Sequence, residues 1–219
     1  MQDYSQNKEQ TIILKYFEGQ LGYFLDIGGN DGETLSNTRA LAQLGWRGVL
    51  VEPAEIAYKK LAERCACSTP EYLRPINAAI VGKDGPVDFW DCGTHIKKGD
   101  TSLLATTRPE TIERWKKTGV IFTKTTVPGL TFASLLKIVE WSAFNFISID
   151  CEGADWEVLQ QINLTEVGCQ MLCVEVNGED DEKFTDYAAK HGMNLHWSCL
   201  RRRPDYGPRD SLGNRIYVK

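Results

Sequence analysis

A glycine-rich turn carrying two aspartates follows the first apolar run of the sequence. The run GYFLDIG is typical of a short buried strand, and it leads into DIGGNDG, residues 26–32. Glycines at the carboxyl end of a parallel strand let backbone N–H groups approach a ligand closely, and ligands of open α/β sheets bind at this edge. The spacing Asp-x-Gly-x-x-x-Gly differs from the G-x-G-x-x-G pattern of dinucleotide sites. The turn is therefore a candidate binding loop for a different ligand.

The charges around this turn indicate which ligand it suits. Asp26 and Asp31 are negative where a pyrophosphate would lie, which disfavours a phosphate-bearing cofactor and suits a cationic one such as S-adenosylmethionine. Glu52 ends the apolar run RGVLVEP, about 20 residues beyond the glycines, the separation at which an acidic side chain receives ribose hydroxyls. No basic residue stands beside it to bind a 2′-phosphate. An ordinary β-turn-α unit with an exposed acid is the alternative, but the two features together predict a nucleoside-binding site.

Polar residues also end two later apolar runs. Asp150 and Glu152 belong to FISIDCEG, and Glu175 and Asn177 to CVEVN. If these runs are neighbouring strands, their acids converge at one sheet edge. One carboxylate would then act as general base on a substrate hydroxyl, or Asp150, Glu175 and Asn177 would ligate Mg²⁺ or Mn²⁺, which lowers the pKa of that hydroxyl. Glu152 is equally suited to cap the following helix, and Cys151, between two acids, is expected to pack rather than react.

Two polar loops offer further candidates. His95 and Ser102 lie in CGTHIKKGDTSLL, where a histidine would serve as acid or base at neutral pH, although a solvated loop histidine is the more common case. A tail loop is rich in arginine and would either clamp an acidic glycan or simply be solvated, which we favour. Its arginines are Arg201, Arg202, Arg203 and Arg209.

Apolar runs alternate with helical patterns along the chain, which predicts an α/β fold with a mostly parallel sheet and helices on both faces. The expected strands are residues 22–28, 47–53, 76–82, 144–150 and 170–177, with 86–92 as hairpin partner of 76–82 and an antiparallel hairpin at the C-terminus. Helices are expected at 10–17, from 34 to 45, and at 54–64, 110–117, 131–141, 154–162 and 181–189. These elements place both polar groups at strand ends.

The 219 residues, 42% of them hydrophobic, suffice for one domain spanning 1–219. Within it we expect an N-terminal helical extension (1–20), a substrate-side loop (93–119) and a C-terminal helix and hairpin (178–219). The polar start equally fits a domain cut from a longer protein. A net charge of -5 argues against nucleic acid as a partner. Seven cysteines without disulfide or zinc spacing, no export signal and no membrane-spanning run favour a cytoplasmic protein. Nothing indicates an oligomeric state.

These motifs occur in the order found in a known family. FLDIGGNDG, GWRGVLVEP, NAAIVG, TFASLLKIVEW, FISIDCEGADWEVL and VEVN resemble the FkbM family of S-adenosylmethionine-dependent O-methyltransferases from about Phe24 to Asn177. The resemblance implies a Rossmann-like class I methyltransferase fold, with a seven-stranded, mostly parallel sheet and an antiparallel last strand. It also implies methylation of a hydroxyl on a sugar or another small molecule. The loop at 93–119 and the tail depart from the family, so the acceptor does not follow from it.

The resemblance also implies roles for single residues. Asp26, Gly28, Asn30 and Gly32 would line the methionine end of the cofactor, Glu52 would hold the ribose, and Asn77 and Ala78 would flank the adenine. Gly29, Asp31 and Pro53, in the same motifs, together with Asp150 complete the predicted cofactor site. Asp150, aided by Glu152 or by a metal shared with Glu175, would remove the acceptor proton. A non-catalytic scaffold and a nicotinamide oxidoreductase are the alternatives; the second would require the missing G-x-G-x-x-G.

Overall fold

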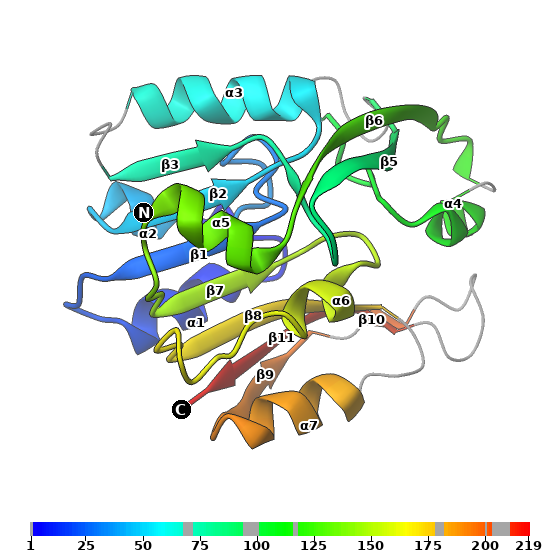
Figure 1. The fold of residues 1–219 in the computed structure, drawn as a ribbon. Coiled ribbons are helices and arrows are strands. Elements are labelled where there is room, and N and C mark those ends of the chain that lie inside the picture. Colours follow the sequence, from blue (N-terminus) through cyan, green and yellow to red (C-terminus); the bar gives the residue numbers. More distant parts are fainter. Residues whose placement is uncertain are drawn as a thin grey trace.

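The structure is a computed structural model that describes residues 2–67, 72–93, 101–115, 118–177, 182–199, 201–202 and 211–219. Its central sheet contains eight strands: seven follow the order β3-β2-β1-β7-β8-β11-β10, and the eighth, β9, pairs with β11 (Figure 1). Neighbouring strands from β3 to β8 are parallel, whereas β11 is antiparallel to β8. The strands are β1 (Tyr23–Ile27), β2 (Arg47–Val51), β3 (Leu73–Ile76), β7 (Phe146–Ile149), β8 (Met171–Asn177), β9 (Asn194–Ser198), β10 (Arg201–Arg202) and β11 (Ser211–Val218). The predicted fold class is confirmed.

Helices cover both faces of this sheet because strand side chains alternate between them. On β1, Phe24 packs with α1 (Glu9–Tyr16), α2 (Arg39–Gln43) and α3 (Glu55–Ala66). Its neighbour Leu25 packs on the opposite face, with α5 (Phe132–Val139), α6 (Asp155–Leu159) and α7 (Glu182–Lys190). Figure 1 shows the second group of helices in front of the sheet. None of the described helices is long and apolar enough to cross a bilayer.

The predicted hairpin between residues 76–82 and 86–92 is wrong. The segment breaks after β3, and β4 (Ala79–Ile80) joins a separate three-stranded sheet of order β4-β6-β5. β6 (Thr123–Leu130) pairs with both β4 and β5 (Gly85–Asp91), so the presumed partners are separated by a strand from much later in the chain. The sequence of β6 contains Pro128 and Gly129, two residue types that are depleted in strands and that conceal its strand character. The short helix α4 (Pro109–Trp115) precedes it.

The predicted helix starting near Thr34 begins five residues later, at Arg39. Side chains hold the intervening residues in a turn. Asp31 Oδ1 accepts hydrogen bonds from the backbone N–H groups of Glu33 and Thr34, and Ser36 Oγ accepts from those of Thr38 and Arg39. Such local side-chain hydrogen bonds compete with helix formation. The turn matters for function because it lies directly beside the glycine-rich loop.

Candidate active site

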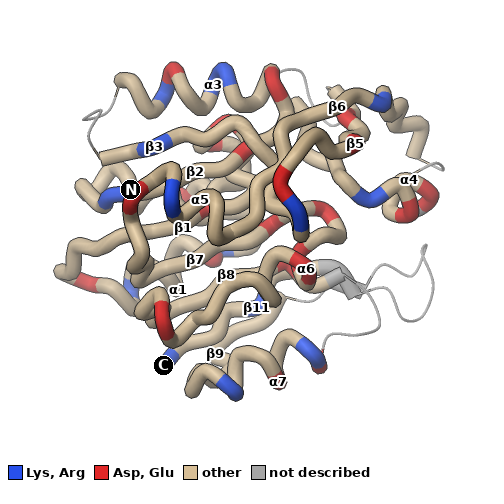
Figure 2. The backbone as a smooth tube through the Cα atoms, viewed as in Figure 1, with Lys and Arg blue, Asp and Glu red and all other residues tan. Residues whose placement is uncertain are grey.

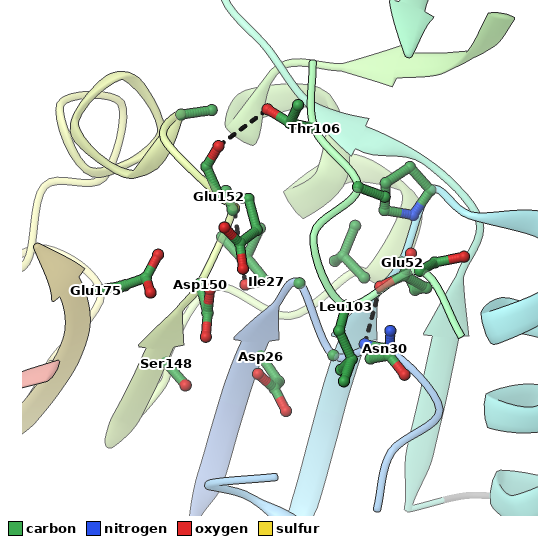
Figure 3. A pocket seen from close by; sticks show the side chains of 18 of the residues that line it. Asp26, Ile27, Asn30, Glu52, Leu103, Thr106, Ser148, Asp150, Glu152 and Glu175 are labelled. Atoms are coloured by element: carbon green, nitrogen blue, oxygen red, sulfur yellow. Dashed lines mark hydrogen bonds between the residues drawn. The ribbon is translucent and has the colours of Figure 1, made fainter. Parts of the chain in front are cut away.

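One pocket lies at the carboxyl ends of β1, β2, β7 and β8 (Figure 3). Most of the candidate residues line it, from both predicted groups. They are Asp26, Gly28, Gly29, Asn30, Glu52, Pro53, Ala78, Asp150, Glu152 and Glu175. The two polar groups found in the sequence therefore form a single site. Figure 2 shows acidic residues near the carboxyl ends of the central strands, whereas many of the basic ones lie on the outer helices.

Glu52 closes one end of the pocket. It is 5% exposed, and its carboxylate accepts hydrogen bonds from the backbone N–H groups of Asn30 (Oε2, 2.8 Å) and Ala54 (Oε1, 2.7 Å). Burial raises its pKa to about 8, despite these hydrogen bonds, and the charges of Asp91 and Asp26 add to the rise. Nearby the pocket is lined by apolar side chains, Ala78, Phe89 and Leu104. We call this part, with its acid and its apolar wall, the nucleoside end.

The glycine-rich turn joins the two ends of the pocket. Gly28 has φ 89° and crosses the backbone of β7 so closely that a Cβ atom would overlap the carbonyl oxygen of Asp150. Its N–H and that of Gly29 both donate to the carbonyl of Val51 on β2. Asn30, also at positive φ, donates from Nδ2 to the carbonyl of Thr101 at 2.8 Å. The turn is thus fixed by β2, β7 and the loop at residues 101–107 together.

Three predicted cofactor residues support this turn without lining the pocket. Asp31 forms an ion pair with Arg64, whose guanidinium also donates to the Asp31 carbonyl. Gly32 lies against Leu61 of α3 at φ 74°, and Asn77 donates from Nδ2 to the carbonyls of Glu52 and Pro53. Their direct contact with a cofactor remains a prediction.

Acids line the other end of the pocket. Asp26, Ser148 and Cys173 are register partners on three neighbouring strands. Two residues further along the chain, Asp150 follows Ser148 and Glu175 follows Cys173 (Figure 3). Burial raises the pKa of Asp26 to about 6. Hydrogen bonds from Thr38 and Ser148 lower this pKa but do not offset the effect of burial. Burial also raises the pKa of Asp150 well above its usual range, and the charges of Asp155, Asp26 and Glu9 add to this. A general base of this kind is poised near neutral pH.

The turn after β7 is held in an unusual conformation. Both oxygens of Asp155 accept backbone N–H groups, Oδ1 from Cys151 at 2.7 Å and Oδ2 from Gly153 at 3.0 Å. Glu152 has φ 49°, and its carbonyl accepts the hydroxyl of Thr106 (Figure 3). Burial raises the pKa of the Cys151 thiol well above its usual value, so this thiol stays protonated at neutral pH. Asp155, not Glu152, caps this turn, and Glu152 faces the pocket.

Three carboxyl groups gather at the acidic end of the pocket. Among described residues, carboxylate oxygens of Asp150, Asp155 and Glu175 lie within 4.8 Å of one another. Both Asp155 oxygens also accept N–H groups, and a carboxylate oxygen that accepts one hydrogen bond keeps a second lone pair for another partner. A side-chain hydrogen bond with Glu175 lowers the pKa of Asp150 against the rise from burial. The Mg²⁺ or Mn²⁺ site stays a prediction, and the side chain of its third expected ligand, Asn177, lies outside the described residues.

Several candidates fall partly or wholly outside the described residues. These are His95, Arg203 and Arg209, together with the side chains of Asn177, Arg201 and Arg202. Ser102, at φ 57°, does line the pocket and donates from Oγ to Asp91 at 2.7 Å.

The sequence did not point to several residues that line the pocket. Ser148 could have been found, because it lies two residues before Asp150 on the same strand face. Asn214 on β11 and Gln6 near the N-terminus could not, since only the folded chain brings them to the strand ends. Thr106, Ser36 and Asn37 also belong to this set.

The ligand-free protein is expected to lose thermal stability as the pH rises from about 4 to about 8. Glu52 has its pKa raised from 4.5 to about 8, and Asp26 to about 6, in both cases chiefly by burial. The folded protein therefore binds more protons than the unfolded chain in this window. The stabilisation from Glu52 is complete below pH 4.5 and is lost as the pH rises through about 8. Differential scanning fluorimetry measures the slope, which Glu52→Gln should flatten; a slope of opposite sign would contradict the assignment.

Comparisons with known proteins agree with this architecture. The family model described as Methyltransferase FkbM domain matches residues 26–197. The structure of methyltransferase FkbM from Methylobacillus flagellatus KT aligns with a TM-score of 0.55 at 12% identity, over 98% of this chain and 48% of that chain. A human methyltransferase 10 domain containing protein aligns with a TM-score of 0.51 at 8% identity, over 97% of this chain and 82% of that one. These similarities concern the fold alone. No curated protein matches the sequence.

Proposed function

This chain belongs to the FkbM methyltransferase family, and from that premise we propose that it transfers a methyl group from S-adenosylmethionine to a hydroxyl group of a small molecule, most suitably a sugar. One observation carries the proposal. A single pocket contains a buried acid with an apolar wall at one end and, at the other, carboxylates whose pKa values are raised by burial. The first arrangement suits a nucleoside, and the second suits removal of a proton from a neutral hydroxyl.

The described residues fit S-adenosylmethionine in charge and shape. Among the residues that the structure describes, every ionisable side chain that lines the pocket is acidic: Asp26, Glu52, Asp150, Glu152 and Glu175. Such a lining favours a cationic ligand over one with a pyrophosphate. Glu52 would bind the ribose hydroxyls, with Ala78 and Phe89 beside the adenine. The glycine turn would hold the methionine part. The bound cofactor supplies an activated methyl group on a sulfonium.

Asp150 is the residue we assign to proton removal. Its raised pKa makes it a stronger base than an exposed carboxylate, and its partner Glu175 holds it by a hydrogen bond. A sugar hydroxyl is a weak nucleophile at neutral pH, so removal of its proton as the new bond forms lowers the barrier. Glu152, on the rigid turn made by Asp155, would orient the acceptor. The remaining work of the protein is alignment of the two reactants.

Chelation of metal ions is expected to leave methyl transfer unchanged. Burial raises the pKa of Asp150 well above its usual range, so this carboxylate is a strong enough base to remove the proton without a cation. The measurement is the initial rate before and after exhaustive dialysis against EDTA. A rate that falls sharply on dialysis and returns with Mg²⁺ or Mn²⁺ would contradict this mechanism and support the predicted cation site.

Calorimetry tests the cofactor assignment independently of the acceptor. Titration with S-adenosylmethionine or S-adenosylhomocysteine should give saturable binding, whereas NAD should give none. In the variant Glu52→Ala the affinity should fall roughly tenfold, because the hydrogen bond from the Glu52 side chain to the ribose hydroxyls is lost. Tight binding of NAD without binding of S-adenosylmethionine would overturn the proposal. Binding with no transfer to any acceptor would instead indicate a non-catalytic scaffold.

A further inference from the structure

The N-terminal segment, residues 2–10, contributes to the pocket although it lies outside the matched family domain. The family model begins at residue 26, yet Gln6 lines the pocket. Ser5 forms a parallel backbone bridge with Leu35, which also lines it. The N-terminal segment therefore runs beside the turn at residues 34–37, at the edge of the same pocket that holds the glycine-rich loop.

Hydrogen bonds within the N-terminal segment fix its conformation. Asn7 donates its backbone N–H to Glu9 Oε2 at 2.6 Å and its Nδ2 to Glu9 Oε1 at 3.0 Å. The backbone N–H of Gln10 donates to Ser5 Oγ at 3.1 Å, and Gln10 Oε1 accepts the N–H of Tyr4 at 3.0 Å. Lys8, at φ 75°, completes the turn before α1. These hydrogen bonds thus hold the N-terminal segment in one conformation around the first turn of α1.

Glu9 connects the N-terminal segment to the acidic end of the pocket. Its side chain is fully buried, and Oε1 accepts a hydrogen bond from Asn214 Nδ2 at 2.8 Å. Asn214 lines the pocket and is the register partner of Glu175 across β11 and β8. Burial is the main cause of the raised pKa of Asp150, and the negative charge of Glu9 adds to it. The proposed proton transfer does not use Glu9, so that mechanism does not explain why this carboxylate is completely buried.

We propose that the N-terminal segment forms one side of the acceptor site, with Gln6 contacting the acceptor and Glu9 positioning Asn214 against it. The inference rests on the proposed function, because it takes the acidic end as the place of the acceptor. Gln and Asn amides each offer both donors and an acceptor, the combination that recognises neighbouring hydroxyls. Together with the acidic lining, these amides select a neutral, polyhydroxylated acceptor and disfavour one that carries phosphate or carboxylate groups.

The test compares the wild-type protein with Gln6→Ala, and uses Gln2→Ala as matched control. Gln2 is exposed and does not line the pocket, and only its backbone carbonyl is used, by Gln10 Nε2. The probes are methyl glycosides of the common hexoses together with glycerol and simple phenols, each assayed with saturating S-adenosylmethionine. For the methylated probe, Gln6→Ala should raise KM roughly three- to tenfold, as expected for one neutral hydrogen bond, with kcat and the Kd of S-adenosylhomocysteine unchanged.

A second variant tests the positioning role. Glu9→Gln keeps the size of the side chain but removes one acceptor oxygen from a residue that accepts three hydrogen bonds. It should raise KM in the same direction as Gln6→Ala, with cofactor affinity retained and the melting temperature recorded alongside.

The outcomes separate this inference from the function on which it rests. An unchanged KM in Gln6→Ala, or an equal loss of S-adenosylhomocysteine binding, would overturn the inference alone. Methylation of a phenol but of no glycoside would overturn the sugar assignment. The KM of Gln6→Ala for that phenol would then test the contact of Gln6 with the acceptor. A wild-type protein that methylates no probe counts against both.

Discussion

The variant Asp150→Asn should lose methyl transfer by roughly 100- to 10,000-fold, the range for removal of a general base, while it keeps its affinity for S-adenosylmethionine within a few-fold. Asparagine has the same shape and retains an oxygen toward Glu175, but it cannot accept the acceptor proton. Asp150 lies at the end of β7, beside Glu175, with its pKa raised by burial. The measurements are single-turnover rates for transfer and calorimetry for binding.

The control for this variant is Asp88→Asn, which removes an exposed carboxylate on β5 that pairs with Lys124. It should leave rate and affinity unchanged. If Asp150→Asn turns over at the wild-type rate with normal cofactor binding, Asp150 is not the base. If instead it loses cofactor binding entirely, Asp150 belongs to the cofactor site and the assignment of proton removal fails.

Gly28→Ala should abolish cofactor binding and destabilise the fold more than an ordinary glycine substitution. The new Cβ atom would overlap the carbonyl oxygen of Asp150, and φ is 89°. The backbone conformation alone costs about 1–2 kcal/mol for a non-glycine residue. Separation of β1 from β7 adds to this, so we expect a total of about 4 kcal/mol or more, which is exceptional for one substitution.

Gly19→Ala isolates the backbone part of this cost. Gly19 also has positive φ, 72°, but an added Cβ would meet nothing within 4 Å. The difference in melting temperature between the two variants therefore reports the destabilisation caused by the overlap at Asp150. Calorimetry with S-adenosylhomocysteine measures how far Gly28→Ala lowers the affinity for the cofactor. Equal destabilisation by the two substitutions, with cofactor binding retained in Gly28→Ala, would mean that the turn tolerates a side chain and is not a close approach.

The sequence predicted the central sheet well because its signals are local. Apolar runs such as FISID and MLCVEV are buried on both faces, and each ends in a polar residue where the strand ends. Parallel strands bring such ends to one edge, so Asp26, Glu52, Asp150 and Glu175 could be placed in one site before any coordinates. Their exact roles within that site remain predictions.

The remaining features depend on contacts between distant parts of the chain. β6 separates β4 from β5, and nothing local in the sequence between residues 79 and 91 indicates this. The start of α2 is set by the Asp31 and Ser36 side chains, which compete with the helix. The helix predicted at residues 154–162 does include Asp155, but no local pattern indicates that its carboxylate fixes the turn that bears Glu152. Gln6 and Asn214 reach the pocket only through long-range packing.

The most direct test of the central claim is mass spectrometry of acceptors after incubation with the wild-type protein and S-adenosylmethionine. We predict that at least one methyl glycoside gains the mass of a single methyl group, with formation of S-adenosylhomocysteine in equal amount, and that Asp150→Asn forms neither product at a comparable rate. Binding of S-adenosylmethionine without methylation of any hydroxyl compound, or methylation by Asp150→Asn at the wild-type rate, would contradict the account.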